Sequence, residues 1–95
     1  MSVLWIANAE VHDPETYKGY AEVASRVIPA HGGVFIARGG EYRQLEGEGR
    51  SRNVVIRFPT MEAAVACYED PEYQAAVDIA KRSAERSIVL VEVTE

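Results

Sequence analysis

The sequence predicts an α+β fold of the split βαβ type, in which helices cover one face of an antiparallel sheet. The first observation is the order of apolar segments along the 95 residues: strand, helix, two strands, a broken helix and a last strand. The second is that the long strands carry apolar side chains on both of their faces. We therefore expect one domain, residues 1–95, whose sheet needs cover on both sides.

The chain begins with a strand that leads into a helix. Val3–Val11 is rich in residues that suit a covered, pleated surface, which predicts the first strand. Asp13 is a good helix cap and Pro14 suits the first helical position, so we expect the helix to start there. Apolar side chains then recur at three- and four-residue spacing as far as Ile28. Pro29 disfavours helical geometry at the residue before it, which predicts the end of the helix.

The middle of the chain predicts two further strands joined by an arm. Val34–Arg38 is the second strand, and the Gly39-Gly40 pair after it allows the chain to reverse. Glu41–Glu46 is interpreted as a short strand or an extended arm. Asn53–Phe58 is the next long strand.

A broken helix and a closing strand complete the order. Thr60 is the expected cap of the first helical segment, and Asp70-Pro71 ends that segment and starts the next. The second segment carries Tyr73 and a series of alanines inward. Ser87–Val93 is the expected last strand.

Alternation along the strands assigns their side chains to two faces. We expect one face to meet the helices; it carries Val3, Trp5, Ala7, Ala9, Val54, Ile56, Phe58, Val89, Val91 and Val93. The other face mixes apolar and polar side chains: Leu4, Ile6, Asn8, Glu10, Asn53, Val55, Arg57, Ile88, Leu90 and Glu92. Since the helices cannot cover both faces, we expect a second copy to cover the open one in a symmetric homodimer. A contact of about 1,200–2,000 Å² in total is usual for a stable pair.

Composition disfavours several classes of function. Fifteen acidic against ten basic residues give a net charge of −5, which disfavours binding to nucleic acid and to anionic membranes. The apolar start, Val3–Ala7, is too short for a signal peptide, and no run reaches transmembrane length. The single cysteine, Cys67, fits a reducing compartment and predicts a cytoplasmic protein with a buried thiol.

Five segments of the chain carry a resemblance when they are taken in order. They are DPETYKGY (13–20), ARGGEYRQLEG (37–47), SRNVVIRFP (51–59), CYEDPEYQAA (67–76) and VLVE (89–92). Together they resemble a family of small bacterial proteins with the domain of unknown function numbered thirteen-thirty. The resemblance implies the dimeric α/β-barrel version of the ferredoxin-like fold. It implies no reaction, because wider relatives of that fold range from cofactor-free monooxygenases to subunits without chemistry.

His31 is the candidate for acid–base chemistry. It lies between the end of the first helix and Gly32-Gly33, and an imidazole can transfer protons near neutral pH. The alternative is a histidine that the helix dipole favours at a helix C-terminus. His12, Asp13 and His31 lack the spacing of a metal site, so we expect no metal. The sequence also has no phosphate loop or nucleotide fingerprint, and we expect no cofactor.

Four residues are candidates for ligand binding. Arg38, next to a glycine pair, can grip a carboxylate or enolate; the alternative is that it anchors the arm through Glu46. Tyr68 and Tyr73 flank the helix break, and we expect Trp5 beneath them, forming aromatic walls for a flat ligand. The alternative is that these aromatic residues belong to the core.

Two functions of different classes remain open. The first is a protein that binds a small anionic or aromatic ligand in a cleft between sheet and helices, and that acts as a cofactor-free enzyme if His31 serves as a base. The second is a non-catalytic homodimeric structural or binding module. A cavity beside Arg38 favours the first function, and side chains that fill this space favour the second.

Overall fold

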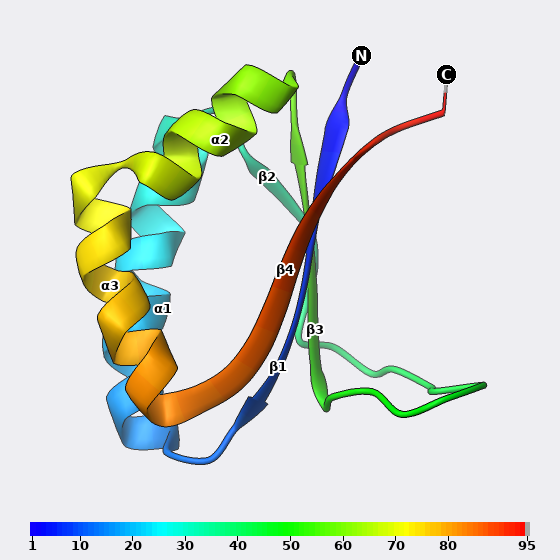
Figure 1. Ribbon diagram of the computed structural model, residues 1–95, viewed down its shortest axis with the longest axis vertical. Coiled ribbons are helices and arrows are strands. Elements are labelled where there is room, and N and C mark those ends of the chain that lie inside the picture. Colours follow the sequence, from blue (N-terminus) through cyan, green and yellow to red (C-terminus); the bar gives the residue numbers. More distant parts are fainter. Residues whose placement is uncertain (95) are drawn as a thin grey trace.

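The computed structural model describes residues 1–94 and has the expected split βαβ architecture (Figure 1). In chain order the elements are β1 (Val3–Val11), α1 (Pro14–Ala30), β2 (Val34–Arg38), β3 (Arg52–Phe58), α2 (Met61–Glu69), α3 (Pro71–Ser83) and β4 (Ala84–Glu92). The strand order is β2-β3-β1-β4, and all neighbouring strands are antiparallel. All of the helices lie on one side of the sheet. This is the ferredoxin-like fold.

Each predicted capping residue begins a helix. The side chains of Asp13, Thr60 and Asp70 accept hydrogen bonds of 2.8–3.2 Å from backbone N–H groups two or three residues downstream. These bonds satisfy N–H groups that have no partner inside the helix. Asp70 both ends α2 and starts α3, as the Asp-Pro pair predicted.

The expected end of the first helix was wrong, and one of the two interpretations of the next loop is confirmed. The helix α1 continues through Pro29 to Ala30. A final turn closes there, because the carbonyls of Ile28 and Pro29 accept hydrogen bonds from N–H groups three residues further on. Of the two interpretations of Glu41–Glu46, the arm is confirmed, since the segment forms no strand and belongs to an exposed loop between β2 and β3. This loop extends from the sheet on the side opposite to the helices (Figure 1).

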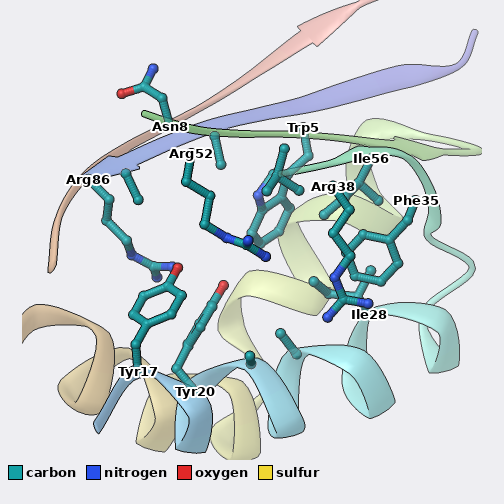
Figure 2. Close-up of a pocket in the computed structure, with 15 residues that line it drawn as sticks. Trp5, Asn8, Tyr17, Tyr20, Ile28, Phe35, Arg38, Arg52, Ile56 and Arg86 are labelled. Atoms are coloured by element: carbon teal, nitrogen blue, oxygen red, sulfur yellow. The ribbon is translucent and has the colours of Figure 1, made fainter. Parts of the chain in front are cut away.

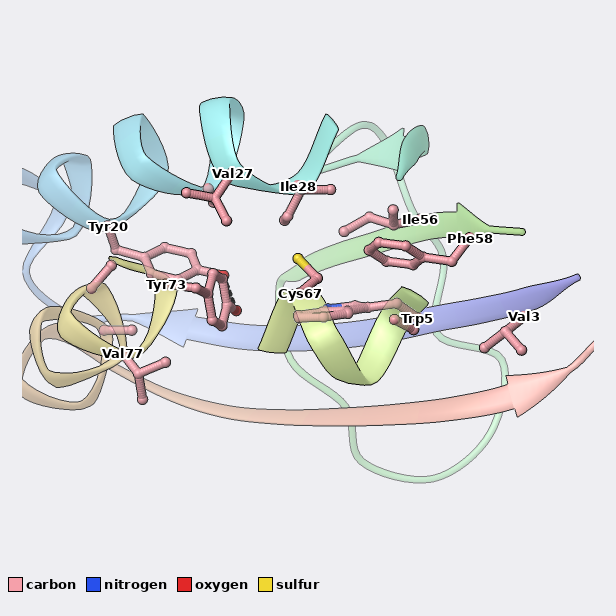
Figure 3. Packing of buried hydrophobic residues seen from close by; sticks show 14 residues of the cluster. Val3, Trp5, Tyr20, Val27, Ile28, Ile56, Phe58, Cys67, Tyr73 and Val77 are labelled. Carbon is pink, nitrogen blue, oxygen red and sulfur yellow. Dashed lines mark hydrogen bonds between the residues drawn. The ribbon is translucent and has the colours of Figure 1, made fainter. Parts of the chain in front are cut away.

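The core lies between the helices and the sheet and is rich in aromatic side chains (Figure 3). Trp5 and Phe58 rise from β1 and β3 and are essentially unexposed. Tyr73 of α3 meets Trp5 edge to face, with 5.6 Å between ring centroids. Its hydroxyl lies 2.7 Å from that of Tyr20 on α1, so the buried phenols are hydrogen-bonded. Cys67 is buried, as predicted, and burial raises the pKa of its thiol to about 11.

The two faces of β4 are the reverse of those predicted. Leu90 pairs with Trp5 and Ile88 pairs with Ala7, so both side chains face the helices, although we expected them on the open face. Val89 and Val91, which we expected to face the helices, are 57% and 46% exposed on the open face. The physical reason is that β4 begins directly after α3 at buried Ala84, which sets the alternation for the whole strand.

The open face of the sheet has a polar part and an apolar part. The polar part is covered by the end of the β2–β3 loop, where Arg50 donates to Asn8 at 2.9 Å and to Ser87 at 2.7 Å. Ser51 similarly donates from its N–H and its hydroxyl to the carboxylate of Glu10, at 3.2 and 2.8 Å. The apolar part has no such cover within residues 1–94; it consists of Leu4, Ile6, Val34, Val55, Val89 and Val91. One charged side chain interrupts it, the exposed Arg57 between Val34 and Leu4, on the face where it was expected.

Candidate functional site

A small, partly open cavity lies between helix α1 and the sheet (Figure 2). Its position follows from the residues of β1. Ala9 is paired with Arg52 on one side and with Arg86 on the other, and Ala7 is paired with Val54. Small side chains at positions 7 and 9 leave a hollow, whereas Trp5 fills the space one pair further along. Tyr17, Tyr20 and Ile28 close the hollow from α1.

Three arginines line this cavity, each from a different strand. Arg38 comes from β2, Arg52 from β3 and Arg86 from β4. No aspartate or glutamate is among the lining residues, and within residues 1–94 none of the three arginines forms an ion pair. Uncompensated guanidinium groups in a partly enclosed space give it a positive potential.

The position of Arg86 is fixed by two tyrosines. Its guanidinium carbon lies 4.4 Å from the centroid of the Tyr20 ring, within the range of a cation–π contact. Its Nη2 also donates to the hydroxyl of Tyr73 at 3.4 Å. Burial, and next the neighbouring Tyr20, raise the pKa of Tyr17, whereas Arg86 and Arg52 oppose this rise. Tyr17 therefore keeps its proton at neutral pH and can donate a hydrogen bond into the cavity.

Gly39 makes room for Arg52. Gly39 has a φ of +68°, a conformation that favours glycine, and its N–H donates to the carbonyl of Asn53 at 2.9 Å. A Cβ atom built on Gly39 would clash with Nη1 of Arg52. The arginine that lies against the backbone of the glycine pair is therefore Arg52, and not its sequence neighbour Arg38.

Replacing Gly39 with alanine is expected to destabilise the protein and to disturb the cavity. The left-handed backbone costs a residue with a Cβ about 1–2 kcal/mol, and the clash moves the guanidinium of Arg52. Urea unfolding measures the first effect and ligand titration the second. Gly40→Ala is the matched control, because a Cβ at Gly40 would have no neighbour within 4 Å and the residue lacks the positive φ. Equal effects of the two substitutions would contradict the role given to Gly39.

Arg38 lies at the edge of the cavity. Its guanidinium carbon is 4.0 Å from the centroid of the Phe35 ring, and its Nη2 donates to the hydroxyl of Ser25 on α1. The structure therefore shows no anchoring of the loop through Glu46, which was the alternative interpretation of Arg38. Its role as a ligand-binding residue stays a prediction.

The other predicted binding residues divide between two places. Trp5 lines the cavity together with Arg38, as expected of a shared site. Tyr68 and Tyr73 do not line it, although their ring centroids are 6.0 and 5.6 Å from that of Trp5. Tyr68 instead lines a second groove, between α3 and β4, with Trp5 and Arg86. Tyr73 is completely buried and supports Tyr20 and Arg86 from behind.

His31 has an acidic partner that the sequence did not reveal. Its Nε2 lies 2.9 Å from Oδ2 of Asp70, 39 residues away, and the contact ties the end of α1 to the start of α3. The hydrogen bond from His31, followed by that from the backbone of Glu72, holds the pKa of Asp70 below its usual value. His31 is not among the residues that line the cavity. Its role as a base stays a prediction.

The cavity contains four functional candidates that sequence reasoning did not select: Tyr17, Tyr20, Arg52 and Arg86. A signal for them was present in Ala7 and Ala9, whose small side chains in a central strand leave space on the covered face. Across residues 1–94, no three histidine, cysteine or acidic side chains gather as a metal site would require. In the same residues, no helix has the length and apolar character needed to cross a bilayer.

Solved structures of three proteins show the same fold with low sequence identity. A protein of unknown function from Rhodopseudomonas palustris is 17% identical, with a TM-score of 0.80 over 99% of this chain and 83% of that one. A dimeric ferredoxin-like protein of unknown function from Jannaschia sp. CCS1 is 17% identical, with a TM-score of 0.77 over 98% and 100%. SnoaB, a cofactor-independent oxygenase from Streptomyces nogalater, is 12% identical, with a TM-score of 0.71 over 99% and 94%.

A search of curated proteins finds no match to the chain. The match to a family model is nearly complete, since it spans residues 2–94. It agrees with the resemblance carried by the five sequence segments. The chain belongs to the family defined by the domain of unknown function DUF1330.

Proposed function

We propose that this protein binds a small organic anion in the cavity between α1 and the sheet. The observation that carries the proposal is the set of three arginines, Arg38, Arg52 and Arg86, in a cavity with no acidic lining residue. The chain as a whole carries a net charge of −5, so this concentration of positive charge is local. Guanidinium groups in a partly water-excluded space bind oxyanions through charge-assisted hydrogen bonds.

The ligand must also have an apolar body. Much of the cavity wall is formed by Trp5, Ala24, Ile28, Phe35, Val54 and Ile56. An inorganic anion makes few favourable contacts with such a wall, whereas an organic ring or chain is stabilised when it leaves water and packs against the wall. A cavity beside Arg38 is the feature that favours the ligand-binding function over a module whose side chains fill the space.

Replacing Arg52 with glutamine is expected to weaken the binding of benzoate, a small aromatic acid, by about 10- to 100-fold, the loss of one charge-assisted hydrogen bond. Isothermal titration measures the affinity, after a thermal-shift screen of aromatic and dicarboxylic acids. Arg43→Gln is the control, since it removes the same charge from an exposed residue outside the cavity. Benzoate binding that is equally strong in Arg52→Gln and wild type would remove this cavity as the site.

We also propose that the protein is a homodimer whose subunits meet through the open face of the sheet. The apolar part of that face includes Ile6, Val55 and Val89, and no other part of residues 1–94 covers it. The β2–β3 loop, with Leu45 83% exposed, extends on the same side. Among the structural neighbours, the Jannaschia protein is described as dimeric. The single buried thiol of Cys67 supports a cytoplasmic location.

Catalysis with His31 as base is a second candidate function. The observation that favours it is the contact with Asp70, because a carboxylate that binds one ring nitrogen orients an imidazole for proton transfer. One structural neighbour, SnoaB, is described as a cofactor-independent oxygenase. The position of His31 outside the cavity makes ligand binding the better-supported function.

A further inference from the structure

The three arginines are spread along the cavity, whose walls are otherwise largely apolar, and we call this space the slot. Arg86 and Arg52 flank Ala9 in one row across the sheet. Arg38 pairs with Val54, which belongs to the next row, and its guanidinium stacks on Phe35. Figure 2 shows Arg86 and Arg38 at opposite ends of the view, with Arg52 and Trp5 between them. An anion with its charge at a single end would contact only some of the three arginines.

Resting on the proposed function, we propose that the ligand is bound as a conjugated oxyanion, a phenolate or an enolate, whose charge spreads over a flat carbon skeleton. A flat body can stack on the aromatic side chains that line this space, Trp5 and Phe35, and can contact the aliphatic side chains of α1 and β3. The delocalised charge can then be shared between the arginines at the two ends and the one in the middle.

Every polar side chain that faces the slot can donate a hydrogen bond into it. Arginine side chains donate and never accept. The hydroxyl groups of Tyr17 and Tyr20 point from α1 toward the guanidinium groups of Arg86 and Arg52 (Figure 2). The hydroxyl of Tyr20 can accept from Tyr73 and still donate into the slot, since the two lie 2.7 Å apart. Asn8, although it borders the cavity, points its amide to the other face of the sheet.

This arrangement favours the ionised form of a phenol or enol over the neutral form. The oxygen of a phenolate accepts from several donors, whereas the proton of a neutral hydroxyl finds no carboxylate or histidine among the lining residues. The hydroxyl proton is released to solvent when the ligand ionises. The ligand's own pKa therefore falls on binding, and each pH unit of this fall corresponds to a tenfold preference for the ionised form.

The direction in which the ligand's pKa changes on binding distinguishes a site dominated by guanidinium groups from one that only buries the ligand. Transfer of a phenol into an apolar pocket disfavours the charged form and raises its pKa. A pocket in which guanidinium groups dominate lowers it. Arg38, Arg52 and Arg86 are the charged side chains that face the slot from the sheet, and α1 contributes only Tyr17 and Tyr20 as titratable groups.

The test uses a nitrophenol, whose ionised form absorbs at a longer wavelength than the neutral form. The full-length protein in excess is titrated with acid and base while the absorbance of the bound dye is recorded. We expect the bound dye to ionise at least about one pH unit below the free dye, a tenfold or greater preference for the phenolate. Arg52→Gln should remove at least half of this shift, and Arg43→Gln should leave it unchanged. Arg52→Lys, which keeps the charge, should retain a downward shift, and circular dichroism confirms that each variant is folded.

The outcomes distinguish the inference from the proposed function. If the nitrophenol binds with an unchanged or raised pKa, while benzoate binding still depends on Arg52, the cavity binds anions but does not select a conjugated oxyanion, and the inference is wrong. If neither the nitrophenol nor benzoate binds to the folded wild-type protein, both proposals are wrong. A downward shift that Arg52→Gln and Arg43→Gln leave equally intact would place the dye at another site and would also overturn the inference.

Discussion

Replacing Val89 with aspartate is expected to convert the proposed dimer into a folded monomer and to raise its dissociation constant by at least about 100-fold. Val89 is 57% exposed in the single chain and is paired with Ile6 in the apolar part of the open face. A partner sheet on this face would bury the new carboxylate among apolar side chains, which costs several kcal/mol. Arg57 of the same face lies in the neighbouring row, next to Leu4, and not beside Val89. The substitution should cost the isolated subunit little, because the side chain already reaches solvent there.

Sedimentation equilibrium over the micromolar range measures this change directly. Val65→Asp is the matched control, since Val65 is 38% exposed on α2, on the helical side of the sheet. The control should remain as dimeric as the wild type. A wild-type protein that is monomeric at micromolar concentration, or a Val89→Asp variant that stays dimeric, would show that the open face is not the subunit interface.

The fold could be predicted because its signals are local. Helix starts depend on short-range hydrogen bonds, and Asp13, Thr60 and Asp70 each cap the helix that the sequence assigned to them. The long strands β1 and β3 alternate clearly enough to place Trp5 and Ile56 on the covered face. The expectation that both faces need cover rests instead on the apolar side chains that β1 and β3 carry on the open face, Leu4, Ile6 and Val55.

The faces of β4 could not be predicted, because the local pattern does not determine the alternation there. Residues 88–91 are four consecutive apolar residues, so either set of alternate residues could face the helices and bury the same kind of side chain. The phase that the structure adopts also turns Arg86 toward the helices, which hydropathy disfavours. Tertiary contacts reverse that preference, since Tyr20 and Tyr73 provide a ring face and a hydroxyl for the guanidinium.

The candidate site was only half predictable for the same reason. Arg38 and Trp5 were selected from their neighbours in the sequence, and both line the cavity. Arg52 and Arg86 are brought together by strand register, one on each side of Ala9, and no sequence spacing encodes this. The contact between His31 and Asp70 likewise joins two helix ends that are 39 residues apart. Side chains that meet only through the sheet or through helix packing lie beyond pattern reasoning on a single sequence.

Replacing Trp5 with alanine is expected to reduce the free energy of unfolding by about 3–5 kcal/mol, a large part of the total stability of a domain of this size. Trp5 is 1% exposed and packs against Phe58, Tyr68 and Tyr73, with ring centroids 5.6–6.0 Å apart. The substitution removes these contacts and leaves a void, because three aromatic neighbours from different elements cannot all move in to fill it. The melting temperature should fall by at least about 12 °C.

Calorimetry and urea unfolding measure this loss, and Tyr42→Ala provides the control. Tyr42 is an aromatic residue of the β2–β3 loop that is 49% exposed, so its removal should change stability by less than about 0.5 kcal/mol. Trp5 also forms part of the cavity wall. In Trp5→Phe, which keeps an aromatic ring in the core, the free energy of unfolding should therefore fall by less than the free energy of ligand binding. If Trp5→Ala were as stable as Tyr42→Ala, the aromatic cluster would not hold the helices to the sheet. The cavity would then lack the rigid floor that its arginines need in order to converge on one ligand.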